Sequence, residues 1–77
     1  MKLPEMTAVE SSNVASVGYL EETKEIYVKF LNGGVYKYKD APKEVFDALL
    51  TADSVGCYLN KKVKNVYPYE KVVLNAN

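Results

Sequence analysis

The chain has 77 residues, and its ten lysines balance its ten acidic side chains to a formal net charge of zero at pH 7. A chain of this length forms one domain that buries about 60% of its unfolded surface. The neutral balance argues against a protein that coats nucleic acid non-specifically, because such proteins need a positive excess. One cysteine and no histidine exclude a disulfide framework and argue against a structural zinc site.

With neither a disulfide nor a metal to stabilise so small a domain, self-association is the remaining source of added stability. The composition includes seven tyrosines, which suits a protein that buries surface against a second copy. We therefore expect a homo-oligomer. No apolar run approaches the roughly 20 residues that span a bilayer, and no signal-peptide pattern opens the chain, so we expect a cytoplasmic protein with no membrane partner.

Residues 1–10 mix apolar and charged side chains without a clear period, which predicts a leader or an arm that docks on another subunit. A polar step then precedes the first strand and consists of Ser11, Ser12 and Asn13. That strand is predicted over Val14–Leu20, with Ala15, Val17 and Tyr19 on one face. Gly18 lowers strand propensity in its middle, so we expect a β-bulge or a close backbone contact there.

The stretch from Glu25 to Lys39 predicts a β-hairpin that turns at residues 32–34, which read Asn-Gly-Gly. Its first strand alternates Ile26, Val28 and Phe30 with the residues between them, the period of two that places one set on a buried face. Asn-Gly is the strongest short-range hairpin signal, because both residues tolerate positive φ. Together with Val14–Leu20 the hairpin forms a three-stranded antiparallel meander.

Two short helices are predicted after the sheet. Pro42 suits the first position of a helix that ends near Thr51, and the apolar stripe of that helix consists of Val45, Phe46, Leu49 and Leu50. Asp53 or Ser54 is a suitable N-cap for the second helix. Its shared apolar face consists of Val55, Tyr58, Leu59 and Val63, and its outward side chains are Asn60, Lys61, Lys62 and Lys64.

The segment Val66–Leu74 is apolar enough to form an edge strand or to reach a neighbouring subunit. The predicted fold class is therefore α+β, with a three-stranded antiparallel β-meander covered by two short helices and followed by an apolar C-terminal tail. We divide the chain into the leader at residues 1–10, a domain at residues 11–71 and the tail at residues 72–77.

Catalysis is not expected from these residues. The commonest general base is absent, since there is no histidine. Cys57 would act as a nucleophile only if a base or a helix end lowered its pKa, and it is otherwise a small buried hydrophobe. Asp40, Asp47 and Asp53 are spread over a loop, a helix and a turn, so they form no acid pair or metal site. Neither a P-loop nor a dinucleotide fingerprint occurs, so we expect no cofactor.

Binding is the better class of function. Tyr36 and Tyr38 alternate with lysines on one strand, so their rings could stack nucleic-acid bases, or they could be core residues with their hydroxyls at the rim. The run Lys61–Lys64 is either a solvated helix end or a phosphate contact shared with nearby polar groups. Those groups are Ser11, Ser12, Ser54 and Asn60. Gly56 in the first turn leaves helix amides accessible to an anion.

In order and spacing, the chain resembles the KTSC domain family from about Glu10 to Tyr69. The first half of the match includes Ser11-Ser12-Asn13-Val14, Val17-Gly18-Tyr19 and Ile26-Tyr27-Val28-Lys29-Phe30. The second half includes Gly34, Tyr36-Lys37-Tyr38, Ala41-Pro42, Val45 to Leu50 and Ala52 to Asn60. Cys57 and Leu59 stand where that family often has arginine and a second aromatic residue, which lowers local positive charge and stacking surface.

The family occurs as the C-terminal extension of some lysyl-tRNA synthetases and as free-standing bacterial and phage proteins, so the resemblance implies a small α+β fold and RNA binding. Our leading hypothesis is a non-enzymatic homo-oligomer that captures a small phosphorylated ligand, such as a cyclic nucleotide. A phage copy would then be a sponge for a host signalling nucleotide in the host cytoplasm. The alternatives are an RNA-binding module and a protein-interaction module. The candidate ligand-binding residues are Ser11, Ser12, Asn13, Tyr36, Tyr38, Ser54, Gly56, Asn60 and Lys61.

Overall fold

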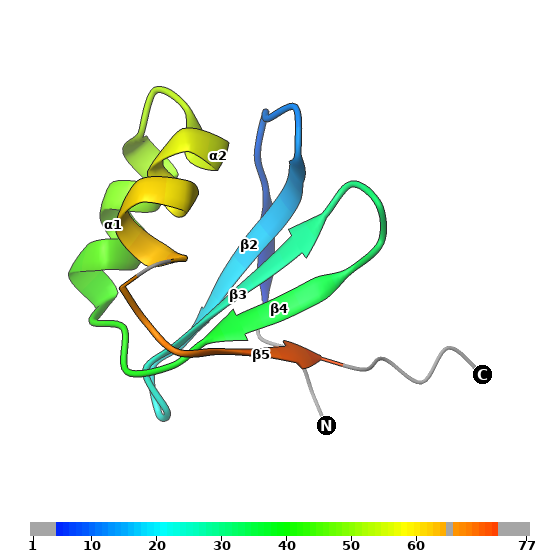
Figure 1. Ribbon diagram of the computed structural model, residues 1–77. Helices are drawn as coiled ribbons and strands as arrows, with labels where there is room; N and C mark the ends of the chain where they lie inside the picture. The colour runs from blue at the N-terminus through cyan, green and yellow to red at the C-terminus, as the bar shows by residue number, and fades with distance from the viewer. Residues whose placement is uncertain (1–4, 65, 73–77) are drawn as a thin grey trace.

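The computed structural model describes residues 5–64 and 66–72 and forms one antiparallel sheet with helices packed on one face (Figure 1). The sheet has five strands in the order β1-β2-β3-β4-β5. The strands are β1 (Met6–Ala8), β2 (Val14–Leu20), β3 (Glu25–Phe30), β4 (Val35–Tyr38) and β5 (Tyr69–Val72). The helices are α1 (Lys43–Thr51), α2 (Val55–Tyr58) and the π-helix η1 (Leu59–Val63), which continues α2 directly.

The predicted α+β class, with an antiparallel sheet and two helical segments, is confirmed, but the prediction of three strands is wrong. Strand β1 lies inside the predicted leader and pairs Met6 with Gly18, and β5 pairs Tyr69 with Tyr38. Both added strands are short and largely exposed, so neither carries the alternating pattern that marks a half-buried strand. Of the predicted tail only Val72 lies in the described part, and residues 73–77 lie outside it, as do residues 1–4.

The hairpin turn forms as predicted. The Phe30 N–H donates to the Gly34 carbonyl at 2.8 Å, and the Asn32 side-chain oxygen accepts from the Gly34 N–H at 2.9 Å. Gly33 adopts a φ of +95°, a value that disfavours any residue with a Cβ.

The β-bulge lies at Ala15, earlier than the predicted position at Gly18. Val14 pairs with Phe30 and Ser16 pairs with Lys29, so Ala15 is the extra residue on β2. The bulge restarts the alternation of β2, with the result that Val14 and Val17 are both buried. The expectation that Ala15 shares a face with Val17 is therefore wrong.

The helices cover one face of the sheet, and a single hydrophobic core lies between the two layers. Ser54 is the N-cap of α2, and its Oγ accepts from the Cys57 N–H at 3.3 Å, as one of the two predicted caps. The Tyr19 hydroxyl donates to the Ala41 carbonyl at 2.7 Å and so ties β2 to the start of α1. The core consists of Val14, Val17, Ile26, Val28, Tyr38, Ala41, Phe46, Leu49, Val55, Leu59 and Val63.

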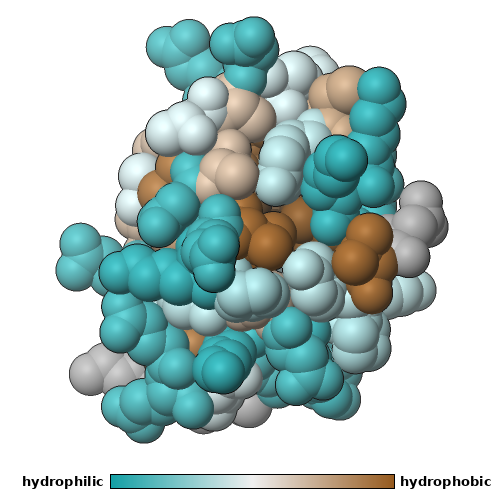
Figure 2. All heavy atoms as spheres, turned by 90° about the vertical axis from the view of Figure 1, so that its left-hand side faces the viewer, coloured by the Kyte–Doolittle hydropathy of each residue, from teal (hydrophilic) through white to brown (hydrophobic). Residues whose placement is uncertain are grey.

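Figure 2 views the molecule from the helical side, where hydrophilic side chains surround a small number of apolar ones. Within residues 5–64 and 66–72, no helix is long and apolar enough to cross a membrane. The helices therefore act as the cover of one sheet face, and the segment after η1 returns along β4 as β5.

Candidate functional site

A groove of about 440 Å³ lies between the sheet and the end of η1. Three ring contacts join its aromatic lining: Phe30 with Tyr36 at 5.6 Å, Tyr36 with Tyr69 at 5.8 Å, and Tyr38 with Tyr69 at 6.0 Å between centroids. The groove therefore presents one continuous aromatic wall. Its lining residues are Phe30, Asn32, Tyr36, Tyr38, Lys64 and Tyr69.

The strand register explains why these rings meet. Tyr36 and Tyr38 are two apart on β4, and Tyr38 lies opposite Tyr69 on β5, so all three side chains leave the same face of the sheet. Tyr38 is only 2% exposed and forms the floor, whereas Tyr69 is 62% exposed and forms the outer wall. The aromatic surface thus runs from the core to the solvent.

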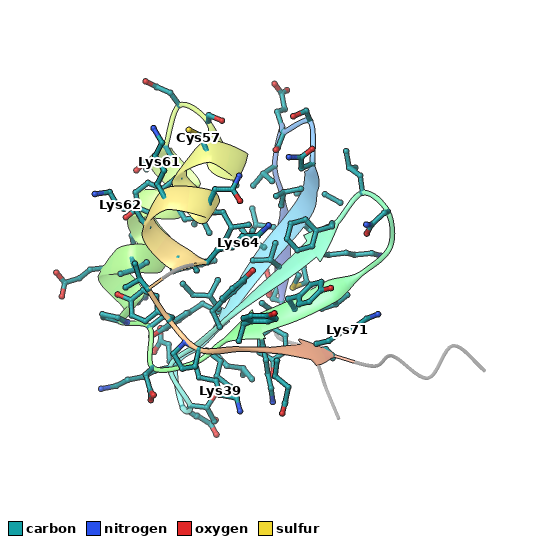
Figure 3. The ribbon with its side chains drawn as sticks, viewed as in Figure 1. Lys39, Cys57, Lys61, Lys62, Lys64 and Lys71 are labelled. Atoms are coloured by element: carbon teal, nitrogen blue, oxygen red, sulfur yellow. The ribbon has the colours of Figure 1, made fainter. Side chains whose placement is uncertain are left out.

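Lys64 supplies the charge of the groove. Its Nζ lies 5.4 Å from the centroid of the Phe30 ring, within cation–π range, and Figure 3 shows it pointing from the helix toward the sheet. No carboxylate of the described residues pairs with it. The sequence pattern placed Lys64 among the outward side chains. In the structure Lys64 directly follows the buried Val63, and its long stem reaches over the groove.

A second hollow of about 340 Å³ adjoins the first. It shares Phe30, Asn32 and Lys64 with the aromatic groove, so the two spaces adjoin at these three residues. Its remaining lining is Ser12, Asn13 and the 60% exposed Leu31. Side-chain hydroxyl and amide groups therefore dominate this compartment.

The Tyr38 hydroxyl is a hydrogen-bond donor at the floor of the groove. Burial, followed by the charges of Tyr36 and Tyr69, raises the pKa of Tyr38 to about 12, so the phenol stays protonated at neutral pH. No described residue forms a hydrogen bond with that hydroxyl. A donor in these surroundings is available to an acceptor that enters the groove.

We call the aromatic groove and the adjoining second hollow together the composite groove. Four of the predicted site residues line it. They are Ser12, Asn13, Tyr36 and Tyr38. The structure adds Phe30, Asn32, Lys64 and Tyr69, which the sequence pattern had assigned to the buried strand face, the turn, the outward helix face and the segment 66–74.

Ser11 and Gly56 lie next to the groove and have structural roles. The Ser11 Oγ accepts from the backbone N–H groups of Asn13 at 3.2 Å and Val14 at 3.3 Å, so it holds the turn that leads into β2. A Cβ on Gly56 would lie 3.3 Å from that same Oγ, a tight contact that would require Ser11 to shift by a few tenths of an ångström. The backbone around Asn13 is thereby held close to α2.

The other predicted residues lie elsewhere on the helical segment. The Ser54 hydroxyl is engaged as the N-cap, and Asn60 is an exposed residue of η1. Lys61 lines a separate shallow depression with Cys57, and Figure 3 shows Lys61 and Lys62 pointing away from the groove. No group of three potential metal ligands occurs within the described ranges.

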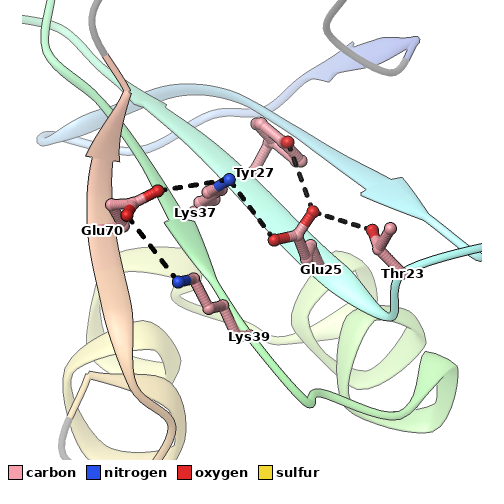
Figure 4. Close-up of polar contacts among 6 residues, drawn as sticks. All are labelled: Thr23, Glu25, Tyr27, Lys37, Lys39 and Glu70. Carbon is pink, nitrogen blue, oxygen red and sulfur yellow. Dashed lines mark hydrogen bonds and ion pairs between the residues drawn. The ribbon is translucent and has the colours of Figure 1, made fainter. Parts of the chain in front are cut away.

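The opposite face of the sheet carries a second set of charges that is internally paired (Figure 4). The Lys37 Nζ lies 3.5 Å from Glu25 and 3.3 Å from Glu70, although the Lys37 side chain is only 10% exposed. Glu25 also accepts from the Thr23 hydroxyl at 2.7 Å and from the Tyr27 hydroxyl at 3.4 Å. This network joins β3, β4 and β5 and leaves Lys37 with two carboxylate partners.

The pairing shifts the pKa values of both partners in the direction expected for ion pairs. The hydrogen bond to Glu70 raises the pKa of Lys37, and the negative charge of Glu25 raises it further. Burial acts in the opposite direction but does not cancel the rise. The hydrogen bond from Lys37 and the Lys39 charge lower the pKa of Glu70. Each group therefore favours the ionised form of the other.

The chain matches the model of the KTSC domain over residues 10–67. It is 42% identical over 57 residues to a protein of Stutzerimonas stutzeri, a match covering 74% of this chain and 80% of that one. It is 41% identical over 59 residues to a protein of Tsukamurella paurometabola, covering 77% of this chain and 88% of that one.

Two further similarities concern a larger enzyme and a solved structure. A lysine–tRNA ligase of Nostoc punctiforme is 30% identical over 63 residues, which is 82% of this chain but 11% of the ligase. The crystal structure of a KTSC domain protein from Yersinia pestis superposes with a TM-score of 0.86 at 23% identity, covering 90% of this chain and 97% of that one. The structural match covers most of the chain and supports the fold.

Proposed function

The chain belongs to the KTSC domain family, and we propose that it is a non-enzymatic binding module that captures a small phosphorylated nucleotide in the composite groove. The observation that carries this proposal is the placement of Lys64. Its ammonium has no acidic partner in the described part of the chain and lies over an aromatic wall, so it offers charge and stacking surface to one ligand.

The ligand would use both features at once. An aromatic base stacks against the rings of Tyr36 and Tyr69, an arrangement worth roughly 1–3 kcal/mol per base in proteins that bind single strands. Its phosphate meets Lys64 through a charge-assisted hydrogen bond. The Tyr38 hydroxyl donates to an acceptor on the base edge. A cyclic nucleotide satisfies these requirements with a single anionic group.

RNA binding is the second candidate. The similarity to a lysine–tRNA ligase over 63 residues favours it, and the aromatic wall would stack the bases of a strand as readily as a free base. The neutral charge balance favours the small ligand, because a strand engages several phosphates at once. The homo-oligomer, the role as a sponge for a host nucleotide and the cytoplasmic location stay predictions.

Thermal melting against mono-, di- and cyclic nucleotides and a short single-stranded RNA tests the proposal. Free ligand at 100 times its dissociation constant stabilises the fold by about 2.7 kcal/mol, which raises the melting temperature by several degrees. The proposal predicts a rise with at least one small nucleotide, lost in Lys64→Ala. A rise with RNA alone would assign the groove to RNA.

No rise with any member of the panel would overturn both candidates and leave a protein-interaction module. A second result bears on the predicted site residues that lie outside the groove. Replacing Lys61 by alanine should leave the melting shift unchanged, since Figure 3 places its side chain on the far side of the helix. A lost shift in Lys61→Ala would move the ligand from the groove to the outward face of η1.

A further inference from the structure

The composite groove has two compartments of different chemistry with one charge at their boundary. The aromatic compartment has a volume of about 440 Å³ and the polar compartment about 340 Å³, each large enough for a nucleoside. The residues that line both are Phe30, Asn32 and Lys64. A mononucleotide seated on the aromatic wall with its phosphate at Lys64 would leave the polar compartment to solvent.

The polar compartment offers hydrogen-bonding groups of the kind that a second nucleoside needs. The Asn32 side-chain oxygen is engaged by the Gly34 N–H, so its amide N–H₂ group is the part left to meet a ligand. Asn13 contributes a second side-chain amide, which forms no hydrogen bond with another described residue, while the backbone carbonyl of Asn13 accepts from the Leu31 N–H at 2.8 Å. Amides pair with the edges of bases and with ribose hydroxyls.

The charge of the groove matches a single phosphodiester. Lys64 is the one charged residue among the lining residues, all of which lie in the described part of the chain. Lys71 shares the sheet face of Tyr36 but lies toward the far end of β5, away from Lys64, in Figure 3. A pyrophosphate or triphosphate would bring two or more further negative charges to a site with one cation. A phosphodiester brings one.

We infer that the ligand is a pair of nucleosides joined by one phosphodiester, with one base on the aromatic wall, the phosphate at Lys64 and the second nucleoside in the polar compartment. This inference rests on the proposed function and narrows its ligand class. The same unit occurs in a free linear dinucleotide and in one step of an RNA strand.

Calorimetric titration of the full chain with three adenine ligands tests the inference. The dinucleoside monophosphate ApA should bind at least tenfold more tightly than AMP, because it fills both compartments. ADP should bind no more tightly than AMP despite its additional charge. Affinity for AMP equal to that for ApA, or affinity for ADP above that for ApA, would overturn the inference and leave the capture of a nucleotide intact. No binding of any of the three would overturn both.

A pair of variants locates the second nucleoside. Asn13→Ala removes one amide from the polar compartment but keeps the carbonyl that accepts from Leu31. It should weaken ApA at least fivefold and AMP less than twofold, with an unchanged melting temperature. Lys71→Ala should change neither affinity by more than twofold. Equal losses for ApA and AMP in Asn13→Ala, or a loss in Lys71→Ala as large as that in Lys64→Ala, would contradict the arrangement.

Hexa-adenylate distinguishes the sources of this unit. ApA at equal or higher affinity than hexa-adenylate would identify a free dinucleotide. Tighter binding of hexa-adenylate, with a salt dependence steeper than the slope of about 0.7 expected for one phosphate of a single strand, would identify an RNA strand. Both outcomes support the shared chemistry.

Discussion

Lys37 and Lys64 lie on opposite sides of the same sheet and meet opposite surroundings. Lys37 lies within 3.5 Å of two carboxylates that come from β3 and β5. Lys64 lies over the Phe30 ring with no carboxylate partner among the described residues. The first lysine is part of a closed network that holds three strands together, and the second is open to a ligand.

The tyrosines of the two faces differ in the same way. Tyr27 is 1% exposed and its hydroxyl donates to Glu25, whereas Tyr38 is almost as buried but has no hydroxyl partner in the described part of the chain. Residue type alone therefore does not distinguish the tyrosines and lysines that hold the sheet together from those that are candidates for ligand binding. The distinguishing feature is whether the polar atom of the side chain has a hydrogen-bond or ion-pair partner within the described part of the protein.

We expect the greatest difference between the two faces in the stability of tyrosine variants. Tyr27→Ala removes a fully buried ring and should lower the free energy of unfolding by about 3 kcal/mol in urea titrations. Tyr69→Ala is the matched change on the groove side, and because Tyr69 is 62% exposed it should change that free energy by less than about 0.5 kcal/mol. Equal destabilisation by both changes would break the distinction between the faces. If Tyr27→Ala does not fold, Tyr27→Leu should likewise lower the free energy of unfolding by more than Tyr69→Ala does.

The second effect concerns affinity. Lys64→Ala should weaken nucleotide binding roughly tenfold to a hundredfold, because a hydrogen bond to a charged group contributes about 1.5–3 kcal/mol. The matched control is Lys62→Ala, which makes the same change of charge on the same helical segment but points away from the groove in Figure 3. Calorimetry should find less than a twofold loss in the control. Equal losses would show that general charge, and not the groove, attracts the ligand.

A smaller effect compares two hydroxyls. Tyr38→Phe should leave the melting temperature unchanged and weaken binding about fivefold, because in the proposed function the hydroxyl donates only to the ligand and contributes about 1 kcal/mol. Tyr27→Phe should lower the melting temperature and leave binding unchanged, since the Tyr27 hydroxyl donates to Glu25 at 3.4 Å. Melting curves and titrations of both variants check the exchange. A destabilised Tyr38→Phe with normal affinity would make Tyr38 an ordinary core residue.

The smallest effect is the acid response of the paired face. Lys37 and Lys39 hold the pKa of Glu70 below its usual 4.5, so its carboxylate is favoured in the folded state. The stability from this pairing is present above the unfolded pKa and is lost as pH falls through the lower folded pKa. Melting temperature between pH 7 and pH 2 should therefore fall less steeply in Glu70→Gln than in the wild type. Parallel curves would mean that Glu70 does not link stability to pH.

The sequence predicted the central strands and both helical segments, because each has a buried face that imposes a period on its apolar residues. The edge strands were predictable only in part. Residues 66–74 were predicted to form an edge strand or to reach a neighbouring subunit, and β5 confirms the edge strand, whereas β1 lies inside the predicted leader. Met6–Ala8 has three residues and Tyr69–Val72 is almost fully exposed, so no alternation records their pairing. A bulge was one of two alternatives predicted at Gly18, beside a close backbone contact, because glycine lowers strand propensity. The pairing of Val14 with Phe30 and of Ser16 with Lys29 places the bulge at Ala15 instead.

The groove was predictable in part. Tyr36 and Tyr38 were found from their spacing, and Asn13 from its place before the first strand. Lys64 belongs to the run Lys61–Lys64, which was interpreted either as a solvated helix end or as a phosphate contact, but of this run only Lys61 was named as a candidate residue. The helical pattern assigns Lys64 to solvent, and the reach of its stem over Phe30 depends on tertiary packing. Tyr69 was missed because its position depends on the pairing of β5 with β4.

The most direct test of the account follows the tyrosine rings themselves. The protein, labelled with carbon-13 on its tyrosine rings, is titrated with ApA and observed by two-dimensional NMR. If the groove binds the ligand, the ring signals of Tyr36, Tyr38 and Tyr69 shift during the titration, while those of Tyr27 on the paired face stay in place. Shifts of Tyr27 with unchanged groove signals, or no shift of any ring, would contradict the assignment of the groove as the binding site.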